Sequence, residues 1–131
     1  MTEDQFKSRT RDFALDVIRF VEGLDRDVVT AHIGRQILRC GTSVGANYRA
    51  ACRARSNAEM VAKLGIVVEE ADETLFWLDL LKASNRGGSN VPEIEKEADE
   101  LLRMTVSSVM TLKGLRSSRN QQSKIENLKS K

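Results

Sequence analysis

The chain has 131 residues, which is the size of one domain with a buried core. Its composition is typical of a soluble helical bundle, with 40% apolar residues, 31% charged residues and a single proline. The formal net charge of +2 is too small to indicate a particular partner. No stretch approaches the ~20 apolar residues of a membrane-spanning helix, and the polar N-terminus does not resemble a signal peptide.

The first predicted helix runs from about residue 3 to residue 24. Thr2 and Gln5 have the spacing of a capping box, in which each residue satisfies a backbone N–H of the other. The apolar face of this helix contains Phe6, Phe13, Val17, Phe20, Val21 and Leu24. Gly23 and the charged residues 25–27 predict a short loop before the next helix.

The second predicted helix spans about residues 28–54 and has one continuous apolar side. At about 100° per residue, this stripe contains Val29, Ile33, Ile37, Cys40, Val44, Tyr48 and Ala51. The helix also contains Gly34, Gly41 and Gly45, and each glycine costs about 1 kcal/mol relative to alanine. Three glycines indicate the close approach of another backbone or, alternatively, a kink near residues 40–43.

The far side of the same helix carries an arginine ladder. It consists of Arg35, Arg39, Arg49 and Arg53, which fall within an arc of ~80°. No acidic residue occurs between Arg35 and Arg55, so the helix itself does not neutralise these charges. The ladder therefore predicts a partner, which is either an acidic protein surface or the phosphates of a nucleic acid.

The third predicted helix, residues 57–83, begins at a Ser56–Glu59 capping box and is apolar on more than one side. Its core stripe contains Met60, Leu64, Val67, Val68, Ala71, Leu75 and Leu78. A second apolar surface contains Ala62, Ile66, Phe76, Trp77 and Leu80. Such a helix is central in the fold or forms an interface. Because no helix of a four-helix bundle is fully surrounded, we expect a subunit contact here; alternatively, the C-terminal segment covers this surface.

A fourth helix is predicted from about residue 90 to residue 115, after a glycine-rich break at residues 84–89. Its core face contains Ile94, Ala98, Leu101, Leu102, Thr105, Val109 and Leu112. Residues 116–131 form a basic tail with five basic residues and one acidic residue, which we expect to be flexible or to become helical on contact. Residues 1–115 are thus predicted to form an all-α, antiparallel up-down-up-down four-helix bundle.

The sequence offers little catalytic chemistry, and we expect no enzymatic activity, no cofactor and no metal. His32 is the sole histidine, and the acids of residues 69–73 lack the Glu-x-x-His pairing of di-iron bundles. Cys40 and Cys52 are ~18 Å apart along one helix, too far for a disulfide. We interpret them as reduced thiols of a cytoplasmic protein.

Two segments carry a family resemblance. The sequences RCGTSVGANYRAA (residues 39–51) and KLGIVVEEADETLFWLDLL (residues 63–81) resemble a bacterial four-helix-bundle family, known from proteins encoded in intervening sequences of large-subunit ribosomal RNA genes. The resemblance covers about residues 6–115 and implies a ring-shaped homopentamer. It also implies kinship with the accessory variability protein of diversity-generating retroelements, a basic pentamer that binds nucleic acid and works with a reverse transcriptase.

Two functions follow as hypotheses. In the first, the protein is a homo-oligomeric assembly or scaffold without membrane contact, whose subunit interface consists of Arg35, Arg39, Arg49, Arg53, Ile66, Glu69, Glu70, Glu73 and Trp77. Here the arginines of one copy meet the acids of its neighbour. In the alternative, the protein is an accessory module that binds RNA or DNA weakly through Arg116, Arg119, Lys124, Lys129 and Lys131.

Overall fold

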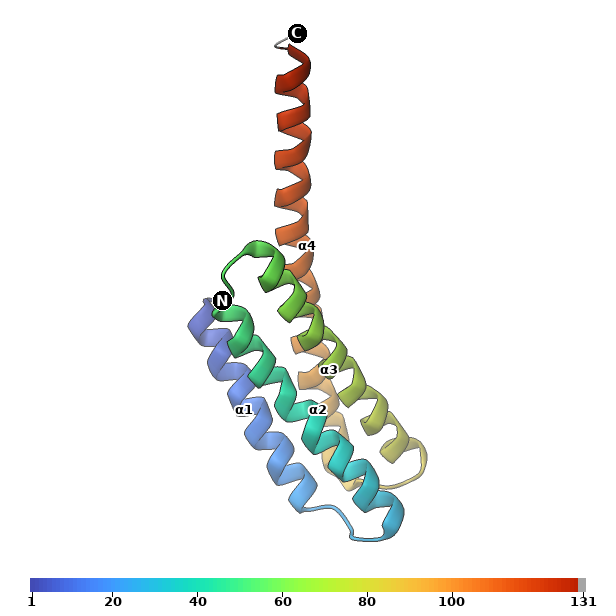
Figure 1. The fold of residues 1–131 in the computed structure, drawn as a ribbon. Coiled ribbons are helices and arrows are strands. Elements are labelled where there is room, and N and C mark those ends of the chain that lie inside the picture. The colour runs from blue at the N-terminus through green and yellow to red at the C-terminus, as the bar shows by residue number, and fades with distance from the viewer. Residues whose placement is uncertain (130–131) are drawn as a thin grey trace.

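The computed structural model describes the backbone of residues 1–129 and the side chains of residues 1–114. Within this part of the chain there are four α-helices, one 3-10 turn and no strand. The elements are α1 (Glu3–Glu22), α2 (Val28–Cys52), α3 (Asn57–Ala83), η1 (Gly88–Asn90) and α4 (Val91–Lys129). Consecutive helices run antiparallel (Figure 1), so the prediction of an all-α four-helix fold is confirmed.

Side-chain caps fix where the helices begin. The Thr2 hydroxyl accepts from the Gln5 backbone N–H at 3.1 Å, and the Gln5 side chain accepts from the Thr2 N–H at 2.8 Å, which confirms the capping box of α1. At α3, Ser56 caps the Glu59 N–H as predicted. The Glu59 carboxylate, however, accepts from the N–H of Arg55 instead of the N–H of Ser56, so only half of the second capping box forms.

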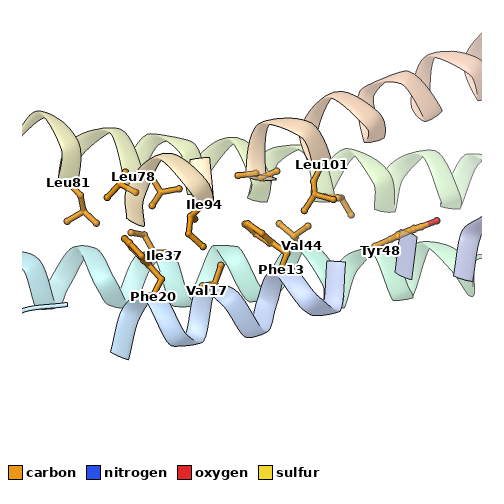
Figure 2. Packing of buried hydrophobic residues seen from close by; sticks show 14 of the residues in the cluster. Phe13, Val17, Phe20, Ile37, Val44, Tyr48, Leu78, Leu81, Ile94 and Leu101 are labelled. Atoms are coloured by element: carbon orange, nitrogen blue, oxygen red, sulfur yellow. The ribbon is translucent and has the colours of Figure 1, made fainter. Parts of the chain in front are cut away.

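The hydrophobic core lies where the inner faces of all four helices meet (Figure 2). Its largest fully buried side chains include Phe13, Ile37, Leu78, Leu81 and Leu101. The predicted faces of α1 and α2 are largely correct, but Val29 is wrong: its side chain is 48% exposed. The side chain that turns inward in the first turn of α2 is Thr30. Val29 lies in the first turn of α2, at one end of the bundle, and there it stays exposed although its helical phase matches the apolar stripe.

The buried stripe of α3 differs from the predicted one. Leu64, Val67, Ala71 and Leu78 are buried as expected, whereas Met60, Val68 and Leu75 are only partly buried. Thr74 and Leu81 are buried instead. The reason is that α3 packs against both α2 and α4, so two neighbouring helices, and not a single core direction, determine which of its side chains are covered.

The glycines of α2 bring α1 close, and α2 runs without a break from Val28 to Cys52. A Cβ atom at Gly41 would lie 2.9 Å from both γ-methyl carbons of Val17, and one at Gly45 would lie 3.2 Å from the Thr10 carbonyl oxygen. Side chains at these positions would push the helices apart. Close packing, and not a kink, therefore accounts for these glycines.

The contact between α1 and α4 is much smaller than those along the chain, and Arg9 bridges it. The Arg9 guanidinium donates to the Glu97 carboxylate at 2.6 and 2.9 Å and also pairs with Glu100. These hydrogen bonds, those to Glu97 above all, raise the pKa of Arg9. The ion pairs of Arg9 with Glu97 and Glu100 thus join α1 and α4, which share little apolar contact.

The fourth helix is longer than predicted. It does not end near Leu115 but continues to Lys129, and its C-terminal part projects beyond the other three helices (Figure 1). The apolar periodicity on which the prediction rested fades where α4 leaves the bundle, because periodicity reports burial and not helicity.

The glycine packing predicts opposite effects of the same substitution at two sites. Gly41→Ala places a methyl group against buried, stiff Val17 and should lower the free energy of unfolding by about 1–3 kcal/mol. Gly65→Ala, also within a helix, meets nothing within 4 Å and should raise it by up to about 1 kcal/mol. Urea denaturation at equal protein concentration measures both. Equal effects of the two substitutions would contradict the packing argument.

Candidate subunit interface

The arginine ladder is not free of acidic partners, because Arg39 is neutralised by α3 of its own chain. Its guanidinium hydrogen-bonds the Glu73 carboxylate and lies 3.5 Å from Glu70 Oε2. The sequence prediction has Arg39 meet these acids in a neighbouring copy, whereas within one protomer Arg39 already pairs with both. The helical phase of residues within α2 could not reveal this pairing, because the two acids lie more than 30 positions later in the sequence.

Glu70 is a member of this ion-pair cluster and is partly buried, with 19% of its side chain exposed. Its Oε2 atom is inaccessible to solvent and finds no hydrogen-bond donor among the described residues. Burial raises the pKa of the Glu70 carboxyl, and the positive charge of Arg39 opposes this shift without cancelling it. Glu70 thus belongs to the α2–α3 junction within one protomer and is poorly placed to meet a second copy.

An aromatic cluster, defined as His32, Phe76 and Trp77, lies next to this junction. The Trp77 indole N–H donates to Glu73 at 3.2 Å, which fixes the orientation of the ring. His32 of α2 and Phe76 both pack edge-to-face on Trp77, with ring centroids 5.9 and 5.1 Å away. Phe76 is nonetheless 54% exposed. The cluster is therefore held by a hydrogen bond and ring packing on its inner side and is open to solvent on its outer side.

The predicted interface residues Ile66 and Glu69 lie on the outward side of α3. We call this side the α3 outer face, and it also contains Asp72 and Phe76. Ile66 is partly buried, whereas Glu69 and Asp72 are exposed. Neither acid forms an ion pair with any side chain of residues 1–114. This face thus combines an exposed aromatic ring with unpaired negative charge.

The other three arginines of the ladder are exposed and have no ion-pair partner in the part of the chain with described side chains. The structure divides them between two places. Arg35 lies in the N-terminal half of α2, near the exposed Val28 and Leu38. Arg49 and Arg53 instead line a groove between α1 and α2. The ladder is thus not one surface.

Sequence reasoning missed the residues that complete this groove. Lys7 and Arg11 of α1 line it together with Arg49 and Arg53. The available signal was that Lys7 and Arg11 are four residues apart, and so on one side of a helix.

The predicted nucleic-acid-binding residues of the C-terminal segment cannot be placed in the same way. The structure describes the backbone but not the side chains of Arg116, Arg119, Lys124 and Lys129, and Lys131 lies outside the described residues.

Groups with catalytic potential are dispersed. Cys40 is buried, the Thr74 hydroxyl donates to its Sγ at 3.1 Å, and burial raises the pKa of the Cys40 thiol. Among the described residues, no three His, Cys, Asp or Glu side chains gather closely enough to hold a metal ion. No helix of this part of the chain is long and apolar enough to cross a membrane.

The partly buried Glu70 predicts a pH dependence of stability. Because its pKa is raised on folding, the folded state holds this proton more tightly than the unfolded state does. Ionised Glu70 therefore lowers the free energy of unfolding above its folded-state pKa, and this cost disappears as the pH falls through that pKa. Glu70→Gln should be at least as stable as the parent chain at pH 7, with an advantage that shrinks toward pH 4. Chemical denaturation at several pH values measures this, with exposed Glu69→Gln as the control. Lower stability of Glu70→Gln at pH 7 would refute the prediction.

The four-helix bundle has counterparts among known proteins. The family model described as 23S rRNA-intervening sequence protein matches residues 3–107, which span α1, α2, α3 and the bundled part of α4. No match is found among curated proteins. A solved structure of a protein with unknown function from the S23 ribosomal protein family of Bacteroides thetaiotaomicron VPI-5482 is 30% identical, with a TM-score of 0.71. The similarity covers 83% of this chain and 98% of that one. The chain belongs to the 23S rRNA-intervening sequence protein family.

Proposed function

We propose that this protein is a non-enzymatic, homo-oligomeric assembly protein of the cytoplasm, and that the α3 outer face is one side of its subunit interface. The observation that carries the proposal is the exposed Phe76 ring, held in place by Trp77. A rigid, exposed aromatic residue is the kind of anchor on which protein interfaces depend. The exposed part of the Phe76 ring contributes no burial free energy to the stability of a monomer.

The complementary surface is the N-terminal half of α2. It exposes two large apolar side chains, Val28 and Leu38, beside Arg35. The α3 outer face of one copy therefore meets apolar groups at its centre, and its acids Glu69 and Asp72 find Arg35 at the rim. An apolar centre with a charged rim is the usual anatomy of a protein interface.

This pairing joins different patches of two copies, so it is a head-to-tail contact. Head-to-tail contacts close into rings when the rotation between copies allows it. The family resemblance implies a ring of five. The interface thus retains Arg35, Ile66, Glu69 and Trp77 from the sequence hypothesis. Arg39, Glu70 and Glu73 instead stabilise the protomer, and Arg49 and Arg53 lie farther along α2, at the groove.

The assembly proposal predicts that one added charge dissociates the oligomer. Phe76→Glu should convert a species of several times 14.7 kDa into a smaller one, because the carboxylate would be buried without a partner. Ile18→Glu places the same charge at an exposed apolar position of α1 and should leave the mass unchanged. Analytical ultracentrifugation at micromolar concentration measures both. A parent chain that sediments as a 14.7 kDa monomer would end the proposal.

A second candidate function is an accessory role with RNA or with a reverse transcriptase. The observation that favours it is the course of α4, which carries the basic residues after Leu115 away from the bundle (Figure 1). A projecting cationic segment can contact phosphates without disturbing the core. Its contribution is electrostatic and independent of sequence.

This second function predicts a salt-dependent loss of binding. Replacing Arg116, Arg119 and Lys124 with glutamine in the full-length chain should weaken binding to duplex DNA at ~50 mM salt. The slope of log K against log salt should become shallower by about 0.9 for each phosphate contact removed. Fluorescence anisotropy measures the binding. Unchanged affinity would show that this segment takes no part in it.

A further inference from the structure

We propose that the groove between α1 and α2 binds the phosphate backbone of nucleic acid. The groove has a volume of about 610 Å³ and is lined by four cationic side chains, Lys7, Arg11, Arg49 and Arg53. The hydroxyl-bearing Ser8 and Thr42 lie among them. This inference rests on the second candidate function and gives it a site within the folded bundle.

The cations of the groove are available for a ligand. Arg11, Arg49 and Arg53 form no ion pair with any side chain of residues 1–114. Lys7 approaches only Asp4, at 3.9 Å, and Asp4 is itself almost fully exposed. The groove therefore holds four positive charges against one acid, in a chain whose net charge is only +2.

The arrangement of the cations suits an extended polyanion. Each helix contributes two cations four residues apart, which corresponds to a rise of ~6 Å along its axis. The two pairs flank one depression because α1 and α2 pack closely there. Gly45 lines the groove at the point where an added Cβ would lie 3.2 Å from the Thr10 carbonyl oxygen. With a larger residue at Gly45, the two rows of charge would stand farther apart.

The lining of the groove favours phosphates over an acidic protein surface. Protein interfaces place large apolar and aromatic anchors at their centre and are depleted of lysine. The apolar residues of this groove are only Ala14 and Ala46, besides Gly45. Arginine, lysine, serine and threonine side chains are typical donors to phosphate oxygens. No aromatic ring lines the groove to stack on bases, so the binding is independent of sequence.

The test compares two double variants of the full-length chain with the same change in charge. Arg49→Glu with Arg53→Glu reverses two groove cations, whereas Arg19→Glu with Arg103→Glu reverses two exposed arginines outside the groove. The probes are fluorescein-labelled duplex RNA, duplex DNA and single-stranded RNA, measured by anisotropy at ~50 mM salt. The milder pair Arg49→Gln with Arg53→Gln replaces the first variant if circular dichroism shows that it does not fold.

We expect the groove variant to bind duplex probes at least about tenfold more weakly than the parent chain, with a salt slope shallower by about 1.8 for two lost contacts. The control should bind more tightly than the groove variant, and the oligomeric mass should be the same in all three chains. Groove-variant affinity equal to that of the parent overturns the inference while leaving the basic segment of α4 as a binding site. No binding of any probe by the parent chain overturns the inference and the second candidate function together. A changed mass of the groove variant assigns the groove to a second copy and also overturns it.

Discussion

The close approach of α1 to α2 is the constraint on which the other surfaces depend. Gly41 and Gly45 lower the helix propensity of α2 by about 1 kcal/mol each. Because they carry no side chain, the Val17 side chain and the Thr10 backbone come into direct contact with α2. Dispersion and burial along this contact offset the propensity cost. The same contact brings the cations of α1 beside those of α2, so packing inside the bundle determines the charge pattern outside it.

The second helix distributes charge between its two neighbours in opposite ways. Toward α3, Arg39 meets Glu73 and the partly buried Glu70, so one positive charge is paired with two negative ones. Toward α1, Arg49 and Arg53 meet Lys7 and Arg11, and the charges add. Repulsion among exposed cations costs little in water, because the solvent screens it. Charge on a partly buried carboxylate such as Glu70 costs more, since desolvation disfavours its charged form. This difference explains why the α2–α3 junction is paired whereas the groove is left open.

Local signals predicted the helices well because caps and periodicity are properties of neighbouring residues. The capping box of Thr2 and Gln5, the Ser56 cap and the inner faces of α1 and α2 could all be read from the sequence. The division of the arginine ladder could not. Arg39 lies against α3, and Arg49 and Arg53 lie beside α1, only once these helices are in place. The residues that they meet there are 30 or more positions away in the sequence. Similarly, the sequence predicts too early an end for α4, because the loss of apolar periodicity near Leu115 marks the end of the bundle and not of the helix.

Both proposed surfaces lie on α2, but they use different halves of it. Arg35 and Arg49 are 14 residues apart, which separates the two regions by ~21 Å along the helix axis. The N-terminal half exposes large apolar side chains and suits a protein partner, whereas the polar C-terminal half lines the cationic groove. The two regions approach each other at Leu38 and Thr42, which are about one turn of α2 apart, so a second copy bound at the first region would lie beside the groove. In a closed ring each copy would present one groove, and linked weak sites raise the effective concentration of a long polyanion at every remaining site. The two proposals would thus support one another, because a ring would turn a groove with only four cations into a repeated surface.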